Sequence, residues 1–284
     1  MKHLFKRTVV LLNEIGNIEN ILKKAIELSN KHNTTLEVLF VHEEPLFSLP
    51  DYFISEDKIE EDRFDTQKIK EHIEDIIQNL NPKNSHSILV RIDDSVNQLI
   101  EYGKEQKEIL VVTNYNRELT PQLIKKSSYS FWIIKNEYKE YSNIVLPLDL
   151  TELSKKAIKI TQHLFSTSSL RIVHDYRYLI DRLYIQEEYL QVAPVATTLD
   201  LEINKKLKKR QKSHFEEYKK IYDIEGDFIE EQHLLKDDLA NYINEHKAEL
   251  TVMYRQDGEL FFSPTLIEEL IKLISTDFLI LTIE

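Results

Sequence analysis

Histidine, cysteine and paired carboxylates are the side chains that most often bind metals or transfer protons, so their spacing is the first test for chemistry. The sequence has ten histidines and no cysteine, which excludes disulfides, thiolate metal sites and cysteine nucleophiles. No H-x-x-x-H or H-E-x-x-H arrangement occurs, and no G-x-S-x-G nucleophile turn can be written. We therefore expect neither a metal centre nor hydrolase activity.

Glycines decide whether a phosphate-binding loop is present, because such loops bring the backbone close to the anion. The chain contains only four glycines, and no two of them stand near each other. They are Gly16, Gly103, Gly226 and Gly258. Neither a G-x-G-x-x-G turn nor a P-loop can be formed from them.

Three charged clusters remain as candidates for binding. Asp93–Asp94 and Asp237–Asp238 are acidic pairs that could bind a divalent cation, although helix capping or plain surface charge is the favoured interpretation. Residues 205–212 (KKLKKRQK) form a basic cluster in an acidic chain. A solvated helix face is the favoured interpretation of this cluster, and a contact for an acidic partner or anion is the alternative.

The elements that would position these residues occur twice along the chain. Each half begins with a β-branched run (TVVLL at 8–12, IVLPL at 144–148) and continues into a helical pattern with apolar residues 3.6 positions apart. The first helix should bury Ile18, Ile21, Leu22, Ala25 and Ile26, and the second Leu153, Ala157, Ile158 and Leu164. Both helices contain the sequence K-K-A-I.

The repetition continues to the end of each half. Second strands (36–42 and 170–176) end near His42 and His174, and long charged helices follow at about 56–80 and 199–222. Third strands (87–94 and 227–233), helices (95–107 and 235–247) and fourth strands (108–113 and 249–254) come next. A helix then starts at T-P-Q-L-I or S-P-T-L-I, with Thr or Ser as the expected N-cap and Pro at the first helical position. A fifth strand closes each half.

This pattern predicts a duplicated α/β fold. Strands that alternate with helices indicate a doubly wound parallel sheet with right-handed crossovers. We expect two Rossmann-like domains, at 1–137 and 142–284, each with five parallel strands. The stretch at 176–196 adds aromatic residues that predict either a lid over a pocket or a helix packed on the second domain.

Composition narrows the function further. The 284 residues carry a net charge of −12, which disfavours general binding to nucleic acid because the phosphate backbone is also negative. The apolar run near the N-terminus is too short for a signal sequence, and no stretch is long enough to span a membrane. The absence of cysteine fits a reducing cytoplasm.

The order of elements resembles the universal stress protein family in its tandem two-domain form, over essentially the whole chain. The turn after the first strand of the second half, in residues 144–157 (IVLPLDLTELSKKA), is similar to the family's acidic turn, with Asp149 at the acidic position. In the first half Asn13 or Glu14 stands there. Residues 91–112 are also similar to the family's third strand, helix and fourth strand. The resemblance implies domains of the adenine nucleotide α-hydrolase-like type with strand order 3-2-1-4-5.

The nucleotide-binding branch of that family carries G-x-x-G-x9-G-S/T after the fourth strand, and neither half keeps this motif. In the first half Thr113 and Asn116 replace the first two glycines, and Lys126 falls at the third. In the second half Tyr254 replaces the first glycine, and Pro264–Thr265 approximates the last pair. We therefore expect no bound cofactor and disfavour ATP.

The leading interpretation is a non-enzymatic, cytoplasmic stress-response protein that acts by binding a protein partner or a small ligand. The rival is a nucleotide or small-ligand binder that uses the cleft of the second domain. A third class, an ATP-pyrophosphatase-like enzyme, would need a Ser-Gly-Gly loop that the sequence lacks. By resemblance, any surviving site would be formed by Asp149, Thr151, Ile172, Val173 and Thr265.

The alternatives for Asp149 and Thr151 stay open at this point. Asp149 could accept a hydrogen bond from adenine or ribose, or it could be an acid that favours the start of the following helix. Thr151 could be a ligand contact or an N-cap. The fifth strands, at 131–135 and 278–284, are apolar edge strands. The resemblance implies that they pair within one chain as a pseudo-dimer, with a homodimer also possible.

Overall fold

The chain folds into two compact units, Met1–Tyr138 and Lys139–Glu284. The structure is a computed structural model that describes residues 5–16, 18–43, 64–104, 108–137, 140–176, 198–230, 234–256 and 264–283. Within these ranges the side chains of 198–204 and 264–265 are not described.

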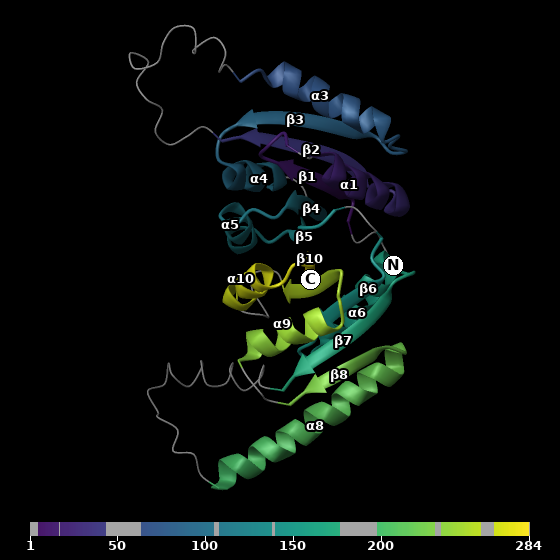
Figure 1. Cartoon of the computed structure of the whole chain (residues 1–284), viewed down its shortest axis with the longest axis vertical. Coiled ribbons are helices and arrows are strands. Elements are labelled where there is room, and N and C mark those ends of the chain that lie inside the picture. Colours follow the sequence, from purple (N-terminus) through teal and green to yellow (C-terminus); the bar gives the residue numbers. More distant parts are fainter. Residues whose placement is uncertain are drawn as a thin grey trace, which may run out of the picture. The chain divides into compact units, whose positions relative to one another are not determined.

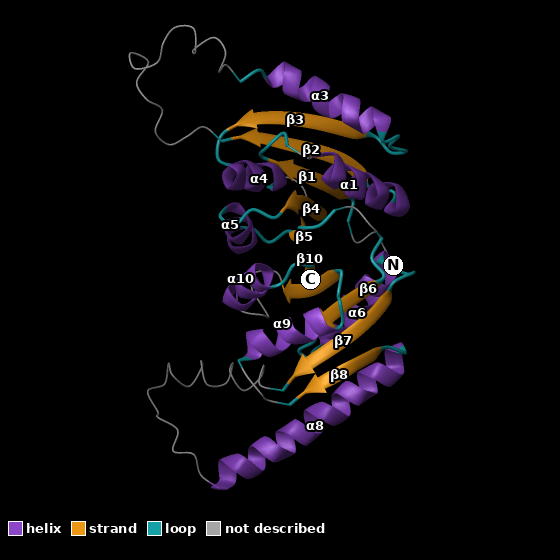
Figure 2. Cartoon of the chain, in the orientation of Figure 1, coloured by secondary structure: helices purple, strands orange, loops and turns teal. Residues whose placement is uncertain are grey.

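The first unit is a doubly wound parallel sheet (Figures 1 and 2). Its sheet has the order β3-β2-β1-β4-β5, and all neighbours run parallel. Its strands are β1 (Arg7–Leu12), β2 (Thr35–His42), β3 (His86–Ile92), β4 (Ile109–Asn114) and β5 (Ser130–Ile134). Its helices are α1 (Ile18–His32), α3 (Thr66–Asn79), α4 (Ser95–Gly103) and α5 (Leu119–Lys126).

The second unit repeats this arrangement with the order β8-β7-β6-β9-β10, again all parallel. Its strands are β6 (Asn143–Pro147), β7 (Ser169–Asp175), β8 (Glu225–Ile229), β9 (Leu250–Gln256) and β10 (Asp277–Ile283). Its helices are α6 (Glu152–Leu164), α8 (Thr198–Tyr222), α9 (Leu235–Glu245) and α10 (Pro264–Leu273). The predicted fold class and the strand order 3-2-1-4-5 are confirmed in both units. The pairing of the two fifth strands stays a prediction.

The apolar faces of the first helices form as their spacing predicts. In α1 the five expected residues are all buried, so the helix lies on the sheet through one apolar stripe. In α6 Ala157, Ile158 and Leu164 are buried, but Leu153 is only half-buried. Ser154 is fully buried, and its hydroxyl donates a hydrogen bond to the buried carboxylate of Asp149.

Several element boundaries differ from the sequence-based prediction, and three of these differences are the largest or affect a predicted cap. Helix α5 begins at Leu119, so Thr120 and Pro121 lie inside its first turn and are not its N-cap and first residue. Of the long helix predicted at 56–80, the described part runs only from Thr66, where the Asp65 carboxylate caps it. Strand β8 starts at Glu225, two residues earlier than predicted, and ends at Ile229; residues 231–233 lie outside the described part.

Gly226 allows β8 to approach β7 closely. A Cβ atom added to Gly226 would lie 2.1 Å from the backbone oxygen of Ile172, with which Gly226 is in register. Backbone of a neighbouring strand cannot move aside without disturbing the sheet. Gly16 offers the contrast, because a Cβ added there would meet nothing within 4 Å.

We predict that Gly226→Ala lowers the free energy of unfolding by about 1–3 kcal/mol, the usual cost of overpacking a core. The matched variant Gly16→Ala should leave it unchanged, because that Cβ enters open space. Urea unfolding followed by circular dichroism measures both. Equal stability of the two variants would show that β7 and β8 can move apart at no cost.

Candidate functional site

The carboxyl ends of β6 and β9 mark the place where doubly wound sheets usually bind ligands, because the strand order reverses there. In the first unit the equivalent strands β1 and β4 pair continuously from Arg7 to Leu11. In the second unit β6 and β9 pair only over Ile144 and Val145. Pro147 has no backbone N–H to donate near the end of β6. The second unit therefore has a gap in its ladder at this point.

Asp149 lies in the turn between β6 and α6, and its carboxylate is buried at 1% exposure. Its Oδ1 atom accepts four hydrogen bonds, from Thr151 N (3.0 Å), Thr151 Oγ1 (2.8 Å), Ser154 Oγ (2.5 Å) and Tyr254 Oη (2.7 Å). Leu150 in the same turn has a φ of 62°, a left-handed conformation that is strained for a bulky side chain. The hydrogen bonds of Asp149 hold this strained turn in place.

Tyr254 projects from β9 across the gap and is fully buried. Its hydroxyl donates to Asp149 Oδ1 and accepts from the Asp149 backbone N–H at 3.0 Å, and it lies 2.7 Å from Ser154 Oγ. Burial, together with the negative charge of Asp149, raises the pKa of Tyr254 well above its ordinary value of 10.0. The tyrosine is therefore a neutral hydrogen-bonding bridge between β9 and the turn.

One oxygen of the carboxylate is left over. Asp149 Oδ2 is buried and has no hydrogen-bond partner among the described residues. Buried polar atoms without a partner are rare, and a water or a ligand usually satisfies them. A water molecule or a ligand with an N–H or O–H group could therefore donate a hydrogen bond to Asp149 Oδ2.

Ile172 and Val173, predicted as ligand contacts, are fully buried in β7. The Val173 carbonyl oxygen accepts a hydrogen bond from Leu148 N at 2.7 Å, so the main chain of the strand end is already paired. His174 follows and packs among the rings of Phe215 and Phe228, with centroid distances of 6.4 and 5.5 Å. Aromatic side chains of the protein therefore surround the carboxyl end of β7.

His174 is fixed by two neighbours. Its Nδ1 atom lies 2.7 Å from the Leu148 carbonyl oxygen and so carries the ring proton, which leaves Nε2 as an acceptor. The side-chain oxygen Oε1 of Gln211 lies 3.5 Å from that nitrogen, and the Gln211 Nε2 atom has no hydrogen-bond partner among the described residues, so turning the amide over would give His174 Nε2 a donor. Burial lowers the pKa of His174 below 6.5, and the nearby Asp175 and Asp149 charges oppose this in part.

Two predicted site residues remain, Thr151 at the start of α6 and Thr265 in α10. Thr151 is the N-cap of α6, its N–H donates to Ser154 Oγ at 3.2 Å, and its carbonyl oxygen accepts from Tyr218 Oη of α8 at 2.8 Å. Thr265 is the second residue of α10, and its side chain lies outside the described part. Gly258, residues 177–196 of the expected lid, and the expected N-cap Ser263 also lie outside it.

Sequence reasoning missed Ser154 and Tyr218, which both contact this turn. Ser154 stands three residues after the N-cap, where Glu or Gln usually closes a capping box, so its spacing could have indicated the role. Tyr218 carries no local signal, because only the packing of α8 brings it to the turn.

The first unit has no equivalent acid network among its described residues. Asn13 is half-buried and Glu14 is exposed after β1. At the start of α5 the Asn116 side chain accepts hydrogen bonds from the N–H groups of Glu118 and Leu119, both at 2.9 Å. Thr120 N donates to the Asn116 carbonyl oxygen. The chain itself thus takes up these donors of the helix start.

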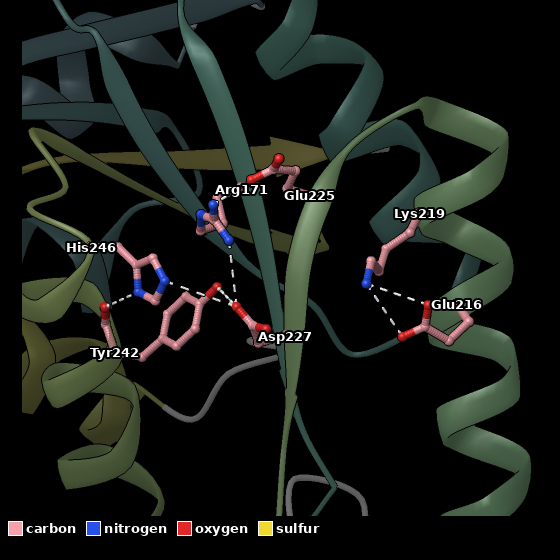
Figure 3. A network of polar contacts seen from close by, with 7 residues as sticks. All are labelled: Arg171, Glu216, Lys219, Glu225, Asp227, Tyr242 and His246. Atoms are coloured by element: carbon pink, nitrogen blue, oxygen red, sulfur yellow. Dashed lines mark hydrogen bonds and ion pairs between the residues drawn. The ribbon is translucent and has the colours of Figure 1, made fainter.

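A second polar network lies at the other end of the second unit's sheet (Figure 3). Arg171 of β7 forms ion pairs with Glu225 and Asp227 of β8, and Tyr242 Oη of α9 donates to Asp227 Oδ2 at 2.7 Å. Open grooves of about 470 and 420 Å³ adjoin this end of the sheet. The network ties the edge strand β8 to its neighbour and to α9.

No group of three metal-ligating side chains gathers anywhere in the part of the chain that the structure describes. The acidic residue Asp94 instead caps α4, where it accepts a hydrogen bond from Asn97 N at 2.8 Å. Asp237 and Asp238 lie in the first turn of α9, where acids favour the helix dipole. Within the described residues, no helix combines the length and apolar character that crossing a bilayer requires.

No protein-family model matches the sequence, and the search among curated proteins finds no match either. Solved structures do match. A universal stress protein from Archaeoglobus fulgidus covers 98% of this chain and is itself covered to 98%, with 12% identity and a TM-score of 0.62. A Pseudomonas aeruginosa protein assigned as a universal stress protein covers 98% of this chain and is covered to 93%, with 13% identity and a TM-score of 0.65.

A functionally unknown protein from Pseudomonas aeruginosa is similar as well, with 12% identity, a TM-score of 0.63 and coverage of 98% of this chain and 92% of that one. At such identities the likeness concerns the fold. The chain therefore has the fold of the tandem universal stress proteins, as its order of elements indicated.

We predict that Tyr254→Phe lowers the free energy of unfolding by about 1–3 kcal/mol, because it leaves the buried Asp149 N–H without an acceptor. Tyr115→Phe is the matched control, since no hydrogen bond of its hydroxyl occurs among the described residues. Urea unfolding compares the two. An unchanged Tyr254→Phe variant would mean that water replaces the hydroxyl.

Because burial lowers the pKa of His174, the unfolded chain takes up a proton on this residue at a higher pH than the folded protein does. Stability should therefore fall as the pH drops below about 6.5, and His174→Gln should reduce that loss. The exposed His72 provides the control, and His72→Gln should keep the wild-type slope. Thermal unfolding between pH 5 and 8 measures it, and parallel slopes for all three proteins would contradict the assignment.

Proposed function

We propose that the chain is a cytoplasmic stress-response protein of the universal stress type, that it acts by binding, and that it catalyses no reaction. The observation that carries the proposal is the closed contact between Tyr254 and Asp149. The acidic position that the resemblance assigns to a ligand already has four donors of the protein on one oxygen. A side chain as large as tyrosine also stands where the nucleotide-binding branch has a glycine.

Loss of the phosphate site in both units is part of this proposal. Anions bind helix starts when several backbone N–H groups point at one place. At α5 the N–H groups of Glu118, Leu119 and Thr120 already donate to Asn116, and Pro121 has none. At α6 the Thr151 N–H donates to Asp149 and Ser154. These contacts support a protein that has exchanged phosphate binding for internal hydrogen bonds.

A second candidate function has one observation in its favour. Asp149 Oδ2 is buried without a partner, so a compact ligand with an N–H or O–H donor could satisfy it. On this alternative the second unit binds a small polar molecule or the base of a nucleotide beside Ile172 and Val173. The paired Val173 carbonyl and the surrounding rings leave few other polar contacts for it.

We predict no ATP hydrolysis and no affinity for ATP with magnesium tighter than about 100 μM, because a hydrogen bond to a charged group contributes roughly 1.5–3 kcal/mol while association costs on the order of 4 kcal/mol or more. Isothermal titration calorimetry of the full chain measures the affinity. A phosphate-release assay measures turnover.

The control is Asp149→Ala in the same titration. A micromolar dissociation constant that this variant abolishes would contradict the proposal and favour the nucleotide-binding alternative. Titration with adenosine separates base binding from phosphate binding, since adenosine lacks the phosphates. Weak adenosine binding lost in Asp149→Ala would favour the small-ligand alternative.

A further inference from the structure

Helix α8 carries a concentration of positive charge on its solvent side. Four exposed cations lie there, and none has an ion-pair or hydrogen-bond partner among the described residues. These residues, the basic face of α8, are Lys205, Lys206, Lys209 and Arg210. Lys205 and Lys209 are four positions apart, as are Lys206 and Arg210, so each pair of side chains lies on the same side of the helix.

Two other lysines of the cluster have a different role. Lys208 and Lys212 each lie 2.9 Å from a carboxylate oxygen of Glu230, directly after β8. Their ammonium groups also lie over the rings of Tyr176 and Phe228. The two cations hold the pKa of Glu230 at about 2. These lysines fasten α8 to its own unit, so the basic face is not needed for that purpose.

The basic face brings like charges close together along the helix. Like charges four positions apart on a helix repel each other, and the face contains two such pairs. The chain has 49 acidic residues, yet the structure pairs none of its described acids with these four cations. A partner that supplies carboxylates opposite these four cations would reduce the repulsion between them.

The pattern around the face favours an acidic polypeptide over a longer polyanion. On the stripe that contains Lys206 and Arg210, the exposed Glu217 lies about 10 Å beyond Arg210, at the 1.5 Å rise per residue of a helix. A continuous nucleic-acid backbone would meet this acid and the net charge of −12. A membrane would require exposed apolar residues beside the cations, and the neighbouring Leu207 is half-buried.

We propose that the basic face of α8 binds an acidic segment of a partner protein, with carboxylates opposite the four cations and a basic residue opposite Glu217. The inference rests on the proposed function, because it names the surface through which a binding protein would act. It uses no residue of the Asp149 network. Nucleotide titration can therefore fail independently of it.

The probe is a fluorescent helical peptide with four glutamates on one face and a lysine two turns beyond them. Anisotropy titration of the full chain in 50 mM salt should give binding that weakens at least tenfold in K205Q/K206Q/K209Q/R210Q. The control K68Q/K70Q/K125Q/K126Q removes the same charge from exposed positions of the first unit and should bind within threefold of wild type. Thermal melting checks that both variants fold.

Glu217→Lys tests the partner's pattern. It should weaken the acidic peptide that carries the lysine and strengthen a peptide of glutamates alone, because it reverses the charge at the end of the stripe. Equal losses in the two quadruple variants, or no peptide binding at all, would overturn the proposal. Tighter binding of single-stranded DNA or phosphatidylserine vesicles through the same four residues would overturn it as well and assign the face to those partners.

Discussion

Parallel strand order places the ends of strands one and four side by side, and what fills the space beyond them determines what each unit can bind. In the second unit the side chain of Tyr254, which is hydrogen-bonded to Asp149, occupies this space. That contact closes the gap left where β6 and β9 stop pairing, and it holds a turn in which Leu150 is strained. Helix α8 adds the Tyr218 hydroxyl to the same turn, so strand, turn and helix depend on one another.

The two units differ in how they use the turn after their first strand and the start of the helix after their fourth. The second unit has an acid at the turn, and four donors of the chain contact its Oδ1 atom. The first unit has no such acid network among its described residues, and it uses Asn116 to take up the first N–H groups of α5. In both cases, backbone groups that could hold an anion are hydrogen-bonded within the chain. A duplicated domain can thus keep its architecture while the chemistry at its carboxyl edge changes.

The charged residues of the second unit have two different roles. In the second unit Arg171, Asp227 and Tyr242 hold the edge strand β8 at one end, and Lys208 and Lys212 with Glu230 hold it to α8 at the other. Cations that hold the fold together lie next to acids of their own unit. The four cations of the basic face are exposed on α8 beside these two lysines and have no ion-pair partner among the described residues.

The sequence alone determined the duplication, the order of elements and the parallel sheets, because strand runs and 3.6-residue spacing are local patterns that any folded state must satisfy. It also located Asp149 and indicated that Tyr254 replaces a glycine. It misjudged the start of α5, since the Asn116 side chain accepts from the N–H groups of Glu118 and Leu119, and spacing does not reveal these contacts. Only the tertiary structure decided that Asp149 Oδ1 accepts from Ser154 and Tyr254, that Tyr218 reaches the turn, and that Val173 is already paired. Those contacts join residues up to 105 positions apart, and long-range packing of that kind leaves no trace in local sequence.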